Sequence, residues 1–278
     1  MGVGTLAHLW RGPLLLQDHA DRVPRFFWRR AALRRALRAA SAVTFCAVEQ
    51  AVPFRGLLSP ETRVVAVPES TSRFTPGDAA GARAATGLRG RPAVLWVGHL
   101  DANKAPLVVL EAVARALPRL PELELWCCYG KAPLLPAVQG FLAARPALQS
   151  RVHLLGAVPH ARVEQLMRGA DLFVLGSRRE GSGYALLEAL ACGLPPVVTD
   201  IPSFRELTDG GRIGHLWRVG DAQACADALV AAGGDRRLSR AAVRAHFDAA
   251  LSPAAVGRRW RRAYEAAAEA WRARPASP

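Results

Sequence analysis

The sequence has almost no lysine, although it is strongly basic. Lysine occurs twice, as Lys104 and Lys131, among the 37 basic residues of a 278-residue chain with a formal net charge of +14. Arginine therefore carries nearly all of the positive charge, which suits an acidic partner such as a phosphorylated substrate, an anionic lipid or nucleic acid. Because the arginines are spread along the chain and form no basic tail, nucleic acid is the least favoured of these partners.

Long apolar runs and paired cysteine motifs are also missing. No apolar stretch reaches the ~18–20 residues that span a bilayer, and the run at residues 14–16 is too short for the core of a signal peptide. We therefore expect a cytoplasmic protein. The five cysteines show no Cys-x-x-Cys spacing, which argues against a metal site or a disulfide framework. We expect reduced, mostly buried thiols.

A regular alternation of strands and helices begins at about residue 92. Short apolar segments there alternate with helical segments of ~10–15 residues, which is typical of a doubly wound parallel sheet. Ligands bind such sheets at the carboxyl ends of the strands. The predicted strands cover residues 93–97, 122–128, 152–155, 171–175, 196–199 and 214–217, and the predicted helices cover residues 106–117, 134–144, 160–168, 184–192, 222–232, 239–250 and 253–272.

The first 75 residues are less regular. Three short apolar segments predict strands, residues 24–40 predict a basic helix, and the polar residues 72–85 predict a linker because Pro76, Gly77 and Gly81 interrupt them. We therefore divide the chain into a partial N-terminal domain, residues 1–75, and a C-terminal domain, residues 76–278. The three predicted strands lie at residues 13–17, 42–47 and 63–67.

The strongest local signal for a binding site is EGSGYALLE, residues 180–188. The segment follows a predicted strand and opens a predicted helix, whose N-terminus presents unpaired N–H groups and about half a positive charge to an anion. Glycines at the turn let the backbone approach a ligand closely. Glu180 in the loop and Glu188 in the helix can then bracket a ligand whose phosphates rest on the helix end. The alternative is an ordinary strand–turn–helix with two solvated glutamates.

The longer segment EGSGYALLEALACGLPPVV resembles the signature of the GT4 family of retaining glycosyltransferases, in which seven residues separate two glutamates. LWVGHLDANK, GADLFVLGSRREG and VVTDIPSFREL resemble the family's neighbouring stretches, so the similarity covers residues 92–235 in order. The resemblance implies a GT-B fold, with a complete C-terminal Rossmann-like doubly wound parallel sheet and here a partial N-terminal Rossmann-like domain. It also implies sugar transfer from a nucleotide-diphosphate sugar donor with retention of configuration and no metal ion.

The resemblance further implies roles for particular residues. Glu180 contacts the donor sugar near its reacting centre, and Glu188 binds the ribose hydroxyls. Lys104, in the loop after the first strand of the domain, binds the diphosphate, for which a lysine is a suitable point charge. The last helix packs back on the N-terminal part. The turn residues that hold the diphosphate with their amides are Gly181, Ser182, Gly183 and Tyr184.

Two histidines extend the predicted site. His99 stands in VGHL, where the family usually has arginine. Imidazole donates hydrogen bonds and carries charge near pH 6.5, so we expect weaker or pH-dependent donor binding; a core or backbone-bonded histidine is the alternative. His19 lies in the region where related enzymes place a histidine near the donor sugar. An N-terminal domain of this family should hold ~150 residues, so we expect that much of the acceptor side is missing.

Three other functions stay open. One is a catalytically inactive or donor-binding-only protein. Another is a basic module that contacts nucleic acid or an anionic membrane surface through residues 24–38, where Phe26, Phe27 and Trp28 lie beside arginines; a solvated helix face is the simpler interpretation. The third is another GT-B-shaped enzyme, such as a sugar-nucleotide epimerase, which the glutamate spacing disfavours. The sequence indicates neither the base, the sugar nor the acceptor.

Overall fold

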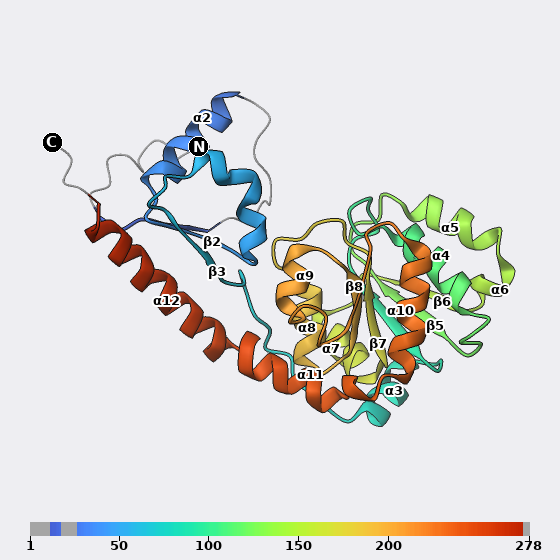
Figure 1. Cartoon of the computed structure of the whole chain (residues 1–278). Coiled ribbons are helices and arrows are strands. Elements are labelled where there is room, and N and C mark those ends of the chain that lie inside the picture. The colour runs from blue at the N-terminus through green and yellow to red at the C-terminus, as the bar shows by residue number, and fades with distance from the viewer. Residues whose placement is uncertain (1–11, 18–26, 275–278) are drawn as a thin grey trace. The chain divides into compact units, whose positions relative to one another are not determined.

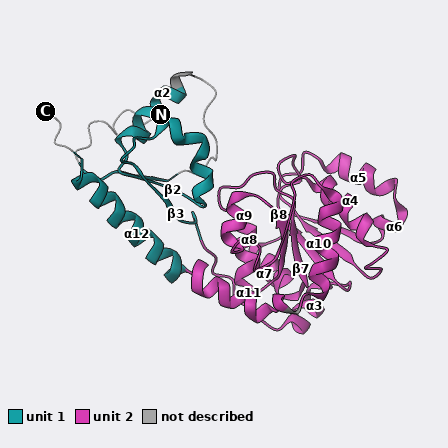
Figure 2. Cartoon of the chain, in the orientation of Figure 1, with its two compact units in different colours: residues 1–70, 253–278 teal, residues 71–252 magenta. Residues whose placement is uncertain are grey.

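A computed structural model describes residues 12–17 and 27–274 and contains two parallel sheets (Figure 1). The chain forms two compact units (Figure 2): unit 1 comprises residues 1–70 and 253–278, and unit 2 comprises residues 71–252. Unit 2 holds a six-stranded sheet and unit 1 a three-stranded sheet. The predicted α/β class, with a doubly wound sheet and a second, smaller Rossmann-like part, is confirmed.

The six-stranded sheet has a reversal in its strand order, which is β6-β5-β4-β7-β8-β9, and every neighbouring pair is parallel. The chain builds outward from β4 through β5 to β6, then returns to place β7 on the other side of β4. The β4–β7 boundary is therefore the topological switch point, beside which open parallel sheets bind their ligands. The strands are β4 (Ala93–Val97), β5 (Glu124–Cys128), β6 (Val152–Gly156), β7 (Leu172–Leu175), β8 (Pro196–Thr199) and β9 (His215–Trp217).

Helices cover both faces of this sheet, and the central strands β7 (LFVL) and β8 (PVVT) are consequently buried along their whole length. One face carries α4 (Pro106–Ala116), α5 (Leu135–Ala143) and α10 (Ala222–Gly234), and the other carries α7 (His160–Gly169), α8 (Tyr184–Ala191) and α9 (Pro202–Leu207) (Figure 1). The remaining helical segments of unit 2 are α3 (Ala79–Thr86), α6 (Pro146–Gln149), η2 (Arg236–Leu238), α11 (Arg240–His246) and the π-helical turn η3 (Phe247–Leu251).

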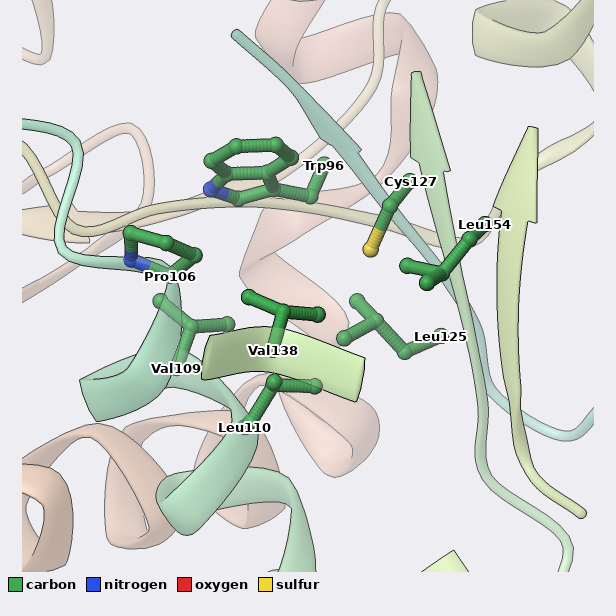
Figure 3. Close-up of a pocket in the computed structure, with 8 residues that line it drawn as sticks. All are labelled: Trp96, Pro106, Val109, Leu110, Leu125, Cys127, Val138 and Leu154. Carbon is green, nitrogen blue, oxygen red and sulfur yellow. The ribbon is translucent and has the colours of Figure 1, made fainter. Parts of the chain in front are cut away.

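A small cavity lies between the sheet and the helices α4 and α5 (Figure 3). Its volume is about 10 Å³, roughly the space of one water molecule. The lining side chains are aliphatic or a thiol except for the indole of Trp96, and the space is too small for more than one water molecule, so the cavity is a packing gap in the core rather than a ligand site. The lining residues are Trp96, Pro106, Val109, Leu110, Leu125, Cys127, Val138 and Leu154.

The sequence predicted a linker over residues 72–85. This prediction is wrong for the second half of the segment, because α3 begins at Ala79. Asp78 caps this helix: its side chain accepts hydrogen bonds from the backbone N–H groups of Ala80 and Gly81, each 3.0 Å long. Gly87 ends the helix at a φ of +75°. Local capping and a run of alanines thus outweigh the glycine at position 81.

The three-stranded sheet of unit 1 has the order β1-β2-β3 and is also parallel. Alternate side chains point to opposite faces. Leu16 and Val64 pack in the cluster formed by α2 (Phe27–Ala39) and the 3-10 helix η1 (Val48–Leu57), whereas Leu15 and Val65 pack with Val256 of the last helix. The strands are β1 (Leu15–Gln17), β2 (Ala42–Phe45) and β3 (Arg63–Ala66).

The last helix, α12 (Pro253–Arg272), belongs to unit 1 and contacts all three of its strands. Its buried positions Val256, Ala263, Ala267 and Ala270 recur at helical spacing and form the face that packs on the sheet. Beyond the helix, Arg274 donates hydrogen bonds to the carbonyl groups of Ala39, the last residue of α2, and of Ala40, which follows it. The end of the described chain is therefore fixed to the first helix of the same unit.

Candidate active site

Two loops meet at the switch point of unit 2. Residues 98–105 follow β4 and residues 176–183 follow β7. The backbone N–H of Arg178 donates to the carbonyl of Asn103 at 2.8 Å, and Asn103 Nδ2 donates to the carbonyl of Arg179 at 3.0 Å. These two bonds join the loops, and they bring together Lys104 and Glu180, which are 76 residues apart in the sequence.

Lys104 and Glu180 form an ion pair between Lys104 Nζ and Glu180 Oε1. Both side chains are largely buried, with 18% and 13% of their surface exposed. The backbone N–H of Lys104 donates to Asp101 Oδ1 at 2.9 Å, which fixes the turn that presents the lysine. Two residues predicted to bind a donor thus lie in direct contact, and any phosphate that binds Lys104 competes with the Glu180 carboxylate.

Helix α8 begins directly after this loop, and its N-terminus carries no capping side chain. Gly183 occupies the N-cap position with a φ of +81°, and a Cβ placed there would lie 2.6 Å from Phe204 Cε1. Only glycine fits this position. The N–H groups of Tyr184 and the next residue have no acceptor inside the helix, by helix geometry, and the side chain of Tyr184 is exposed. The preceding turn residues, Gly181 and Ser182, are half-buried and buried respectively.

Glu188 lies one turn further along α8, on the same face as Tyr184. Its Oε1 is 2.7 Å from Nε2 of His160, the first residue of α7. The His160 ring in turn packs against Phe74, with ring centroids 4.6 Å apart. This contact could not be predicted from the sequence, because no local pattern links two helix residues that are 28 positions apart.

A cavity of about 230 Å³ lies at the carboxyl ends of β4, β5 and β6. Most of its lining residues are small or apolar, and the exceptions are His99 and Tyr129. The backbone N–H of Lys131 donates to His99 Nδ1 at 3.2 Å, so the neutral ring carries its proton on Nε2, which is left as a donor. The lining residues are Val97, Gly98, His99, Cys128, Tyr129, Gly130, Ala157, Val158 and Val163.

The thiol in this cavity is not a nucleophile near neutral pH. Burial raises the pKa of Cys128 to about 11, although nearby Arg162 lowers it in part. A thiol with that pKa is almost fully protonated at pH 7, and the thiolate is the reactive form. Among the described residues, no group of three or more His, Cys, Asp or Glu side chains could hold a metal ion.

Of the other residues predicted for the site, His19 lies outside the residues that the structure describes. Lys104, Glu180, Glu188, His99 and the turn at residues 181–184 all lie in unit 2, at the carboxyl ends of its strands. Within the described part of the chain, no helix combines the length and the apolar character that crossing a bilayer requires.

The fold of the whole described chain is that of the GT-B class of glycosyltransferases. The crystal structure of Anabaena HepE in complex with UDP and glucose superposes with a TM-score of 0.73, covering 93% of this chain and 73% of that one at 21% sequence identity. At this identity the likeness shows the fold alone.

Sequence comparison identifies the family. A family model described as "Glycosyl transferases group 1" matches residues 91–235, more than half of the chain. The chain belongs to this family of glycosyltransferases, GT4, as its signature predicted.

Curated relatives agree with this membership. D-inositol 3-phosphate glycosyltransferase of Nocardia farcinica is 37% identical over 186 residues, which are 64% of this chain and 41% of that protein. Phosphatidyl-myo-inositol mannosyltransferase of Mycobacterium leprae is 34% identical over 143 residues, 50% of this chain and 36% of that protein. The chain thus matches less than half of the length of these relatives.

Proposed function

We propose that this protein transfers a sugar from a nucleoside-diphosphate sugar to a hydroxyl-bearing acceptor with retention of anomeric configuration. The observation that carries the proposal is the placement of Lys104, Glu180 and Glu188 around the uncapped N-terminus of α8, at the switch point of the sheet. An anion is stabilised there by the helix dipole, by unpaired N–H groups and by a cation, three features that together suit a diphosphate.

Each part of the donor has a matching feature in unit 2. The diphosphate rests on the amides at Gly183 and Tyr184 and on Lys104, and Glu188 accepts hydrogen bonds from the ribose hydroxyls. The cavity beside His99 holds the base, since its apolar walls suit an aromatic ring and its small residues admit one. This arrangement places Glu180, next to Lys104, at the sugar end of the donor.

The chemistry of transfer is mainly electrostatic in this proposal. As the bond between the sugar and the diphosphate breaks, negative charge develops on the leaving phosphate, where Lys104 and the α8 amides already point. Such preorganised donors usually supply the largest share of catalysis. The acceptor hydroxyl attacks from the face that the diphosphate leaves and gives its proton to the departing phosphate oxygen, so the configuration of the anomeric carbon is retained.

A transfer assay with radiolabelled donors tests the proposal. UDP-, GDP- and ADP-linked sugars are each incubated with the protein and a panel of acceptors that includes D-inositol 3-phosphate and phosphatidyl-myo-inositol, which appear in the names of the relatives. We expect label to move from one donor class to one acceptor, with the anomeric configuration of the donor kept in the product.

Matched variants make this assay specific. Lys104→Ala should abolish most of the transfer. The control variant, Arg212→Ala, removes an exposed cation that pairs with Asp209. Arg212 precedes β9 and therefore lies at the amino ends of the strands, away from the site. Arg212→Ala should leave the rate unchanged. Binding of a nucleoside diphosphate without transfer to any acceptor would support a donor-binding protein instead, and an inverted product would contradict the retaining mechanism.

A further inference from the structure

The contact between His160 and Glu188 includes a residue, His160, to which the proposed function gives no role. His160 Nε2 lies 2.7 Å from Glu188 Oε1. His160 is the first residue of α7, and Glu188 lies one turn inside α8. The glutamate side chain is mostly buried, with 19% of its surface exposed, but the histidine side chain is 70% exposed. The imidazole therefore lies at the surface, with one edge directed at a carboxylate below it.

We propose that His160 is a positioning residue that holds the Glu188 carboxylate in the orientation needed to bind the ribose of the donor. This inference rests on the proposed function, because it presumes that a nucleotide binds at α8. A carboxylate only accepts hydrogen bonds, so the His160 Nε2 atom must carry the proton and donate it. That donation occupies Oε1 and leaves the other carboxylate oxygen to accept from a hydroxyl group.

The benefit of such a support is entropic. A glutamate side chain has several rotatable bonds, and fixing a long polar side chain costs conformational entropy. A hydrogen bond that fixes the carboxylate in advance removes part of that cost from the binding step, which is the general advantage of preorganisation. The His160 ring is itself restrained, because it packs at a centroid distance of 4.6 Å against Phe74, which is buried.

A purely structural role explains the contact less well. The ring is mostly exposed, so its burial contributes little to stability. Helix α7 is held by its buried residues Val163, Leu166 and Met167. Helix α8 is held by five buried residues of its own, which do not include Glu188. Alanine is also a better helix former than histidine. The variant His160→Ala should therefore fold, with a midpoint of thermal unfolding close to that of the unchanged protein.

The test is a binding cycle by isothermal titration calorimetry. The ligand is whichever of UDP, GDP and ADP stabilises the unchanged protein, and its 2′,3′-dideoxy form serves as the comparison because it lacks the hydroxyls that Glu188 would bind. We expect His160→Ala to weaken binding of the ribonucleotide about three- to tenfold, the effect of one supporting hydrogen bond. We expect no change in binding of the dideoxynucleotide.

Two further variants sharpen the cycle. In a Glu188→Gln background, His160→Ala should have no additional effect, because the supported carboxylate is already gone. His160→Gln, whose amide can reach Glu188 and donate, should restore part of the lost affinity. Equal weakening of both nucleotides would overturn the assignment, since the defect would then not involve the ribose, and tighter binding by His160→Ala would show that His160 competes with the ligand.

The outcome also separates this inference from the function on which it rests. If none of the three nucleotides binds the unchanged protein, the proposed function and the role of His160 both fail. If a ribonucleotide binds and Glu188→Gln weakens it but His160→Ala does not, the proposed function stands and only the role of His160 is wrong.

Discussion

At the scale of single residues, the proposed donor site depends on the ion pair between Lys104 and Glu180, because a phosphate that binds Lys104 competes with the Glu180 carboxylate. The strand–loop–helix pattern placed both residues at the carboxyl ends of strands, so their presence near one site followed from the sequence alone. Their direct ion pair did not follow, because it depends on how two loops 76 residues apart are joined. The same limit applies to His160 and Glu188, whose contact joins two helices.

The ion pair changes the expected effect of replacing Glu180. In Glu180→Gln, Lys104 loses the carboxylate that competes with phosphate, so affinity for a nucleoside diphosphate should be kept or should rise by roughly two- to tenfold, the scale of one charge-assisted interaction. Transfer should fall ~100-fold or more, because Glu180 lies at the reacting end of the donor. Titration calorimetry and the transfer assay measure the two effects separately.

The control for this variant is Glu111→Gln, which alters a carboxylate on α4 that pairs with Arg115 outside the site. It should change neither binding nor transfer. Markedly weaker nucleotide binding by Glu180→Gln would mean that the carboxylate supports the diphosphate site instead of competing with it.

The cysteines give a prediction about pH. Burial raises the pKa of Cys128 to about 11 and that of Cys192 to about 12, from an ordinary value of 9.0. Unfolded thiols ionise as the pH passes 9 while these two stay protonated in the folded protein, so the unfolded state releases protons first and stability falls as the pH rises above 9. Urea unfolding between pH 8 and 10 should show a declining free energy of unfolding.

A double variant, Cys128→Ala with Cys192→Ala, is the control for the decline in the free energy of unfolding between pH 8 and 10. Its stability at pH 8 should be lower because two buried side chains become smaller, but its decline toward pH 10 should be shallower than that of the unchanged protein. An identical slope in both proteins would show that other groups cause the decline.

At the scale of elements, periodicity predicted the strands and helices of unit 2 well, but it missed segments that depend on capping or on packing. Asp78 starts α3 in a stretch that its proline and glycines marked as a linker. The helix η1 contains Pro53 and shows no helical period in its sequence, and it is stabilised by burial of Phe54 and Leu57 in the core of unit 1. Tertiary packing of this kind outweighs local propensity.

The start of α8 is the element on which the site depends, and two glycine substitutions test it. Gly183→Ala should lower the stability of the protein by roughly 2 kcal/mol or more, because a positive φ strains an alanine and its Cβ would lie 2.6 Å from Phe204. Gly257→Ala, at an exposed interior position of α12 with no atom near the added Cβ, should raise stability by about 0.5–1 kcal/mol. Denaturant unfolding measures both.

The binding data should separate these two glycines as well. Gly183→Ala shifts the amides that would hold the diphosphate, so nucleotide affinity should fall, whereas Gly257→Ala should leave it unchanged. If Gly183→Ala kept full affinity and full stability, the turn would not have the geometry on which the site is built.

At the scale of the whole molecule, the chain passes from unit 1 to unit 2 after Ser70 and returns after Ser252. The described residues to which the proposed function gives a role in donor binding all lie between these two points, so the proposal places the nucleotide on unit 2 alone. The two-sheet GT-B architecture could be predicted because the family signature covers most of unit 2. The packing of α12 on the strands of unit 1 was expected from the family resemblance alone, because its apolar face and those strands lie some 200 residues apart in the sequence and no local pattern links them.

The most direct measurement is thermal unfolding with UDP, GDP and ADP on the unchanged protein, Lys104→Ala and Arg212→Ala. A ligand at 100 times its dissociation constant adds ~2.7 kcal/mol to the free energy of unfolding. Each variant is compared with and without nucleotide, so the stability that Lys104→Ala loses with its ion pair to Glu180 does not enter the comparison. One nucleotide should raise the midpoint of the unchanged protein and of Arg212→Ala, and much less that of Lys104→Ala, whose affinity should fall ~10-fold or more. No shift with any nucleotide, or an equal shift in Lys104→Ala, would contradict a donor site at Lys104 and α8.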